Sequence, residues 1–144
     1  MLADADRLSR EPVKALGNWS AGQIFRHLAI SFNNSIDGFP MTFPWYFRLM
    51  ATIFKKKLLA GSMPPGFQLS SDAAKFMVPG PTPLEEGLAD LRAAILRLEQ
   101  DPHRARNPVF GDISKEEWDQ IHLKHASLHM SFFVPEQIVY AQPE

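Results

Sequence analysis

The chain has 144 residues, the size of one ordinary domain, and its contents of 45% hydrophobic and 22% charged residues are typical of a soluble globular protein. Its net charge of −1 gives no overall field that would attract nucleic acid or an anionic membrane, so we expect neither as a partner. The absence of cysteine excludes disulfides and thiolate nucleophiles, fits a cytoplasmic protein, and leaves histidine and oxygen as metal ligands.

The N-terminal part of the chain predicts two helices. Residues 2–16 carry a modest helical pattern that Pro12 breaks, which predicts a short extra helix followed by a turn. Ser20 and Gln23 have the spacing of a capping box, so we expect a second helix to begin there and to run to about residue 36.

A polar stripe follows this second helix. His27, Ser31 and Asn34 are spaced four and three apart, so they share one face of the helix. Ile24 and Leu28 lie close to the same stripe, which indicates that His27 faces the core.

The most apolar region of the sequence predicts a core helix over residues 44–60, with Pro44 in its first turn and Gly61 as a left-handed residue that ends it. Prolines and cations interrupt this region, so no apolar run reaches the roughly 18–20 residues of a membrane span. The first residues also lack the apolar stretch of a signal peptide. We interpret Lys55-Lys56-Lys57 as a solvated helix end rather than as a phosphate or nucleic-acid patch.

Residues 61–81 are rich in proline and glycine and predict a long loop, which is either a lid over a site or a simple crossover. Thr82 and Glu85 have capping-box spacing, so a further helix should begin there and extend to about residue 100. That helix has an apolar seam typical of a helical bundle, formed by Leu84, Leu88, Leu91, Ile95 and Leu98.

A polar connection over residues 101–113 leads to the last expected helix, which Ser114 and Glu117 should cap and which should end near residue 133. Three histidines on this helix are spaced three and four apart, so at about 100° per residue they project within roughly 60° of one another. They are His122, His125 and His129. The pattern as a whole predicts an all-α four-helix bundle with no convincing strand, in one domain over 1–144 with a core of about 17–135 and a tail over 136–144.

The histidines are the candidate metal ligands. His125 and His129, at positions i and i+4, can share one ion, and His27 is the histidine on another core-facing helix that can supply a third ligand. Three protein ligands with an open position are typical of a catalytic zinc centre. The alternative is that the histidines are hydrogen-bonded in the core without a metal, and His122 is either a substitute ligand, an acid or base, or a solvated side chain.

Other catalytic classes find little support. The sequence has no GxGxxG, P-loop or GxSxG motif, and Ala126 after His125 excludes the HExxH motif of zinc proteases. A carboxylate-bridged di-iron centre needs inward glutamates, whereas Glu116 and Glu117 lie in the expected capping turn.

Two blocks of the sequence, with a weaker third between them, resemble the domain-of-unknown-function 1569 family of the DinB/YfiT-like superfamily. The first block is Asn18-Trp19-Ser20-x-Gly22-Gln23-Ile24-x-x-His27-Leu28 with Ser35-Ile36-Asp37-Gly38-Phe39-Pro40. The second is Pro108-Val109-Phe110-Gly111 followed by Glu117-Trp118 and His122-x-x-His125-x-x-Leu128-His129-x-Ser131-Phe132, and the weaker third is Met63-Pro64-Pro65-Gly66-Phe67. One departure is Asn107, where the family often has histidine, and the N-terminus is shorter than in many relatives.

The resemblance implies an up-down-down-up four-helix bundle with a divalent metal held by three histidines, which match His27, His125 and His129. Known relatives include transferases that use mycothiol or bacillithiol, a maleylpyruvate isomerase and stress-induced proteins, and many are dimers. We therefore expect a homodimer with a divalent ion, zinc or nickel being favoured, and a small-molecule thiol or electrophile as its substrate.

Three functional hypotheses follow. The first is a metal-dependent, thiol-dependent transferase or hydrolase in which His122 or Asn34 orients the reacting group. The second is a helical module that binds a metal or small ligand without turnover. The third is a structural dimer whose histidines form an internal polar network.

Overall fold

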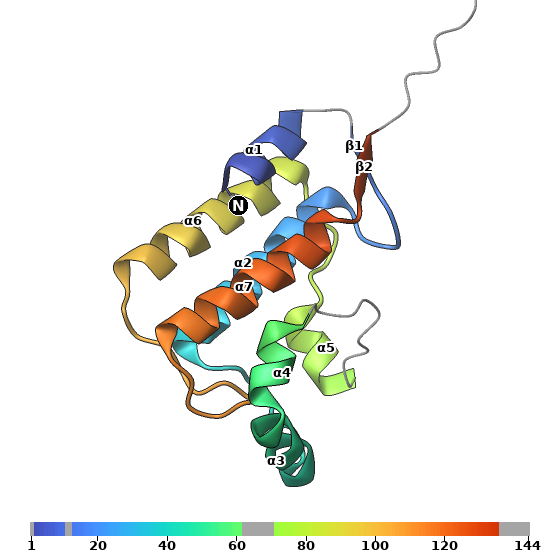
Figure 1. Cartoon of the computed structure of the whole chain (residues 1–144). Helices are drawn as coiled ribbons and strands as arrows, with labels where there is room; N and C mark the ends of the chain where they lie inside the picture. Colours follow the sequence, from blue (N-terminus) through green and yellow to red (C-terminus); the bar gives the residue numbers. More distant parts are fainter. Residues whose placement is uncertain (1, 11–12, 62–70, 136–144) are drawn as a thin grey trace, which may run out of the picture.

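The computed structural model describes residues 2–10, 13–61 and 71–135 (Figure 1). Its helices are α1 (Leu2–Arg10), α2 (Ala21–Asp37), α3 (Trp45–Ile53), α4 (Lys55–Ala60), α5 (Ser71–Met77), α6 (Leu84–Gln100) and α7 (Lys115–Met130), and its strands are β1 (Val13–Ala15) and β2 (Phe133–Pro135). The fold class is all-α, as predicted, apart from this small sheet. Within the described ranges, no helix is both long and apolar enough to cross a membrane.

Helix α2 lies at the centre of the molecule. It begins at the expected capping box, in which Ser20 Oγ accepts from Gln23 N at 3.2 Å and Gln23 Oε1 accepts from Ser20 N at 3.0 Å. Its apolar face is fully buried at Phe25, Leu28 and Phe32. Burial of such side chains is worth about 1.5–3 kcal/mol each, so α2 holds the core together.

Helices α2 and α6 cross with their main chains in near contact. A β-carbon added at Gly87 would lie 2.2 Å from the carbonyl oxygen of Gly22, and one added at Gly22 would lie 2.3 Å from the carbonyl oxygen of Thr82. Both positions therefore require glycine because there is no space for a side chain. This close crossing fixes the N-terminal part of α2, which carries His27.

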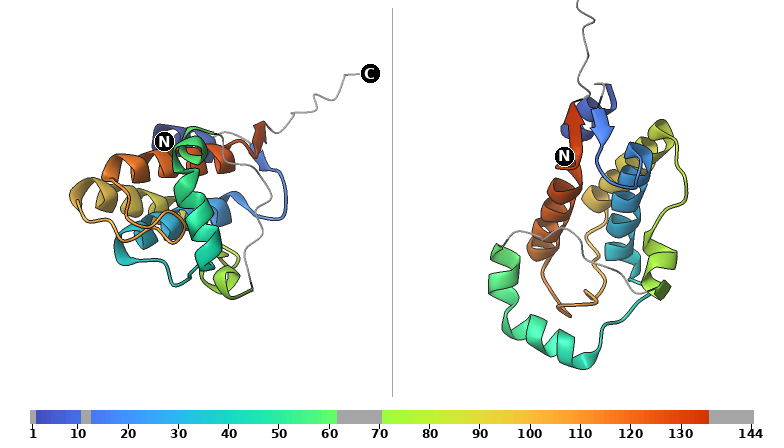
Figure 2. Two further views of the ribbon diagram at one scale, coloured as in Figure 1. Left: turned by 60° about the horizontal axis from the view of Figure 1, so that its bottom comes forward. Right: turned by 90° about the vertical axis from the view of Figure 1, so that its right-hand side faces the viewer.

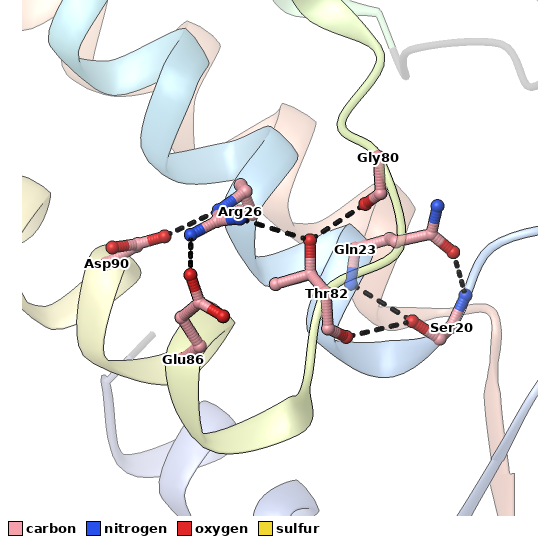
Figure 3. A network of polar contacts seen from close by, with 7 residues as sticks. All are labelled: Ser20, Gln23, Arg26, Gly80, Thr82, Glu86 and Asp90. Atoms are coloured by element: carbon pink, nitrogen blue, oxygen red, sulfur yellow. Dashed lines mark hydrogen bonds and ion pairs between the residues drawn. The ribbon is translucent and has the colours of Figure 1, made fainter.

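Two arginines join the same pair of helices near opposite ends of α2. Arg26 donates to Asp90 Oδ2 at 2.7 Å and also to Glu86, with a longer contact of 3.5 Å to Thr82 Oγ1 (Figure 3). Arg97 of α6 donates to Asp37 Oδ2 at 2.7 Å. These contacts set the register of α2 against α6. Arg26 is the residue directly before His27, so this register also positions His27.

The start of α6 differs from the sequence prediction. Its N-cap residue is Pro83, which makes no side-chain capping bond, and the expected capping box of Thr82 and Glu85 is wrong. Thr82 Oγ1 instead donates to the carbonyl oxygen of Gly80 at 2.8 Å. The close crossing at Gly22 explains this difference, because the main chain of Thr82 is packed against α2.

The two ends of the described chain meet in the small sheet. Strands β1 and β2 pair antiparallel, with Lys14 opposite Val134, and Leu16 N donates to Phe132 O at 2.8 Å. The expectation of no strand was wrong here, because β-pairing depends on a partner more than a hundred residues away. The last helix accordingly ends at Met130 rather than near residue 133, and the tail over 136–144 lies outside the described residues.

The region expected as one helix over 44–60 is two helices. The chain bends at Phe54, with φ −96° and ψ 11°, between α3 and α4. Gly61 does not adopt the expected left-handed conformation, since its φ of −71° and ψ of 167° are extended. Helix α5 lies within the loop expected over 61–81, of which residues 62–70 lie outside the described residues.

The short helices lie around α2, α6 and α7. Helix α1 packs on α6 with Ala5 fully buried, and α4 lies against α7. Helix α3 lies at the end of the molecule opposite α1, and α4 and α5 are next to α7 and α2 respectively (Figures 1 and 2).

Candidate metal centre

Three histidines from two helices converge on one point. His27 comes from the N-terminal half of α2, and His125 and His129 lie one turn apart on α7. His125 Nε2 lies 3.2 Å from His27 Nε2 and 3.0 Å from His129 Nε2, and one candidate ligand atom from each ring lies within 4.8 Å of the other two. Their helical spacing predicted that these three residues would lie together, and the structure places them so.

The ring of His27 is oriented by a main-chain carbonyl. Its Nδ1 lies 2.7 Å from the carbonyl oxygen of Met77, the last residue of α5. Since a carbonyl oxygen can only accept, Nδ1 must carry the hydrogen, and in the neutral ring Nε2 then carries a lone pair. A hydrogen bond of this kind is what usually orients a metal-bound histidine.

The spacing of the nitrogens fits a divalent cation. Nitrogens at about 2.0–2.1 Å from a common ion are separated by about 3.3 Å in a tetrahedral site and by about 3.0 Å at right-angled positions. His125 Nε2 has two nitrogen neighbours at such distances, and a single N–H on His125 can donate to one of them but not to both. A cation accounts for all three nitrogens, whereas a neutral hydrogen-bonded cluster leaves at least one of the two contacts without a hydrogen bond.

The environment keeps the three imidazoles neutral. Burial lowers the pKa of His27, partly offset by its bond to Met77 O. Burial and the neighbouring His27 and His129 hold the pKa of His125 well below its usual value, and burial followed by His27 lowers the pKa of His129 to about 4. Near neutral pH all three rings are therefore uncharged, and each has one nitrogen with a lone pair, which is the state that binds a metal.

The site is closed on one side and accessible on another. His27 is 6% exposed, whereas His125 and His129 are half-buried. Trp19 covers the rings, with its centroid 4.9 Å from that of His27 and stacked 6.0 Å from that of His129. Sequence reasoning did not predict this role for Trp19, and its position next to the Ser20 cap is the signal that could have suggested it.

Among the described residues, Asn34, a candidate catalytic residue, contacts Met77 rather than the three rings. Its Nδ2 approaches Met77 Sδ at 3.5 Å, so it lies beside the residue whose carbonyl orients His27. His103 is exposed on the connection between α6 and α7.

His122, the other candidate catalytic residue, contacts Ser35 rather than the three convergent histidines. Its Nε2 lies 3.0 Å from Ser35 Oγ, and its ring stacks on Trp118. Its Nδ1 is buried and has no hydrogen-bond partner among the described residues. Burial, aided by the positive charge of Arg104, lowers the pKa of His122 to about 4, so this ring is also neutral near pH 7.

His122 also lines a surface cleft that α6 and α7 form. The cleft has apolar walls at Ile95, Leu98 and Leu123, with charged side chains of Lys115 and Asp119 beside them. The cleft that His122 lines is therefore separate from the three convergent rings, none of which lines it.

These features define an all-α protein with three histidines within metal-binding distance. The family model described as protein of unknown function (DUF1569) matches residues 1–136 of the 144, and the chain belongs to this family. No curated protein and no solved structure shows a significant match to the chain.

Proposed function

We propose that this protein is a metal-dependent enzyme of the DinB/YfiT-like type, a thiol-dependent transferase or hydrolase with a divalent ion on His27, His125 and His129. The observation that carries the proposal is that the Nε2 atoms of the three histidines converge on one point. Because His27 Nδ1 donates to Met77 O, the lone pair of that ring is on Nε2 and faces the same point. When bound, a divalent ion would lower the pKa of a water or thiol and so supply a nucleophile at neutral pH.

Several residues of the chain bind the ion, orient its ligands or limit the access of water. The three histidines bind the ion, the carbonyl of Met77 fixes the ring of His27, and Trp19 excludes water from one side of the site. Asn34 acts on this arrangement through Met77. The partial exposure of His125 and His129 leaves a path by which a small thiol or electrophile can approach.

The proposal includes the architecture that the resemblance implies. Helices α2 and α6 run in the same direction and α7 runs opposite to them, so these three would be the second, third and fourth members of an up-down-down-up bundle, and α1, which packs on α6, would be the first. The homodimer also belongs to the proposal, and sedimentation of the purified protein would measure it.

The first experiment tests the metal. Protein purified without a histidine tag should contain about one ion per chain by elemental analysis, with zinc or nickel expected. His125→Ala should lower the affinity for that ion by about a hundredfold or more, because it removes the central ligand. His103→Ala, in an exposed histidine outside the site, is the matched control and should bind the ion as the wild type does.

The second experiment separates an enzyme from a binding module. The loaded protein is assayed with low-molecular-weight thiols and small electrophiles, with His125→Ala as the inactive reference. Turnover that the variant lacks supports the enzyme, while metal binding without turnover supports a module that binds a metal or small ligand. If tag-free protein takes up no ion, or if His125→Ala binds one as tightly as the wild type, the proposed centre is wrong.

A further inference from the structure

Helix α3 presents a broad apolar face to the surface. Six exposed side chains form this face, and the most exposed are Trp45 at 75% and Ile53 at 63%. We name the six the α3 face: Trp45, Tyr46, Leu49, Met50, Ile53 and Phe54. At about 100° per residue they span roughly half of the helix circumference. On the opposite side Ala51 is buried, so the helix turns its small residue inward and its large ones outward.

The position of α3 leaves this face uncovered. Among the described residues, α3 contacts the adjoining helix α4, and α4 in turn lies against α7. The views of the chain show α3 at one end of the molecule, away from α1 and the small sheet (Figures 1 and 2). A contiguous exposed group of large apolar side chains on a monomer usually marks a binding surface.

The segment of the chain that carries the α3 face contains charges of one sign. Residues 38–71 contain Arg48, Lys55, Lys56 and Lys57 and no aspartate or glutamate. Because the whole chain has a net charge of −1, this segment carries +4 and the rest of the chain carries −5. Lys55 is paired with Glu117 at 2.8 Å, while Lys56 and Lys57 are exposed at the start of α4.

We propose that the α3 face, together with Lys56 and Lys57, docks on the surface of an anionic lipid bilayer. A helix with aromatic and aliphatic residues on one face and lysines at its border lies in the plane of the membrane interface, where tryptophan and tyrosine are favoured. Anionic headgroups attract the lysines. We expected no membrane partner because the net charge of the whole chain is −1. The positive charge of residues 38–71 means that this net charge does not describe the segment that would meet the membrane.

The charge favours lipid over a second copy of the chain. In a two-fold dimer the same patch meets itself, so two sets of lysines would approach each other. An anionic bilayer neutralises them and receives the apolar side chains in the same contact. This docking is independent of the metal centre, since none of its residues belongs to that site.

The test uses the full-length, tag-free protein and vesicle flotation. Vesicles of phosphatidylcholine alone are compared with vesicles that also contain phosphatidylglycerol. The protein should float with the anionic vesicles and much less with the neutral ones. Replacing both lysines (Lys56→Gln with Lys57→Gln) should lower the partition coefficient roughly tenfold to thirtyfold, because each lysine near the surface contributes about 1 kcal/mol.

Matched controls separate the α3 face from general changes in charge and hydropathy. Lys14→Gln with Arg106→Gln removes two exposed cations elsewhere and should leave binding unchanged. Trp45→Ser with Ile53→Ser should abolish flotation, whereas Leu96→Ser with Leu123→Ser, at exposed leucines on α6 and α7, should not. Circular dichroism confirms that each variant is folded.

Two results would overturn the proposal. The first is equal flotation with neutral and anionic vesicles, or none with either. The second is that the wild type does not float but forms a concentration-dependent dimer in sedimentation, and that Trp45→Ser with Ile53→Ser dissociates this dimer. That result would assign the α3 face to a second copy of the chain.

Discussion

Two buried histidines of this protein are held in opposite tautomers. His27 donates from Nδ1 to a carbonyl, so its lone pair is on Nε2 and points toward the other rings. Ser35 Oγ donates to Phe32 O at 2.6 Å, so His122 Nε2 must donate to Ser35 and its lone pair is on Nδ1. The same residue type is thus prepared as a ligand in one place and as a part of the core in the other.

The neutral state of His122 makes the stability of the folded protein depend on pH. Its pKa is lowered to about 4 in the folded chain and is near 6.5 in the unfolded chain, so the unfolded state binds the proton first as the pH falls. The contribution is fully present above pH 6.5 and is lost between pH 6.5 and about 4. In metal-free protein, His122→Phe should reduce this loss by up to about 3 kcal/mol, measured by urea unfolding across the range.

The exposed His103 provides the comparison for this measurement. His103→Phe makes the same substitution at an exposed position and is measured in parallel. An unchanged pH dependence in His122→Phe would show that the ring is not kept neutral by burial.

At the scale of the elements, the crossing of α2 and α6 decides where the site forms. Gly87 approaches Gly22 so closely that neither helix can shift without separating their main chains. Arg26 adds ion pairs to Asp90 and Glu86 beside the crossing. His27 follows in the next position, so its place relative to α7 depends on this contact.

Gly87→Ala should therefore destabilise the protein, although alanine is the better helix former by about 1 kcal/mol. Its β-carbon would lie 2.2 Å from the carbonyl oxygen of Gly22, and the three nearest atoms all belong to the main chain of Gly22, which cannot move aside as a side chain can. We expect the free energy of unfolding to fall by about 2–3 kcal/mol in chemical denaturation. Gly80→Ala is the control, because a β-carbon there meets no atom within 4 Å; equal effects of the two changes would contradict the close crossing.

The parts that sequence could predict are those with local causes. The capping boxes at Ser20 and Ser114 involve residues three positions apart, and both are present. The proximity of His125 and His129 follows from helix geometry alone. His27 was predicted to join them from its apolar neighbours, and the resemblance placed the same three residues together.

The parts that sequence could not predict depend on distant contacts. Strand β1 forms because β2 pairs with it, and Thr82 is drawn into the crossing with α2 instead of capping α6. Helix α5 was hidden among the prolines and glycines of residues 61–81. A glycine inside a helix pattern gives no sign that another main chain passes over it, so the roles of Gly22 and Gly87 required the structure.

At the scale of the whole molecule, the candidate centre joins segments that are far apart in the chain. His27 and His125 are separated by 98 positions, and the carbonyl of Met77 adds a third segment. A ligand that binds the folded chain but not the unfolded one stabilises the fold by mass action.

Metal should accordingly raise the melting temperature of the protein. At a free concentration about a hundredfold above the dissociation constant, the gain is about 2.7 kcal/mol. Thermal unfolding of wild type with chelator and with zinc should show a higher transition in zinc, and His129→Ala should lose most of the difference. A rise of the same size in His129→Ala would place the stabilising ion elsewhere.

The contact between Met77 and His27 has a consequence for how the sequence can vary. The bonding atom is a main-chain oxygen at the end of a helix, where carbonyls lack partners inside the helix, so any residue type at position 77 can provide it. An inserted or deleted residue in α5 is different, since it turns the terminal carbonyl by about 100° around the helix axis. The orientation of the His27 ring is thus insensitive to point substitutions at position 77 and sensitive to changes in the length of α5.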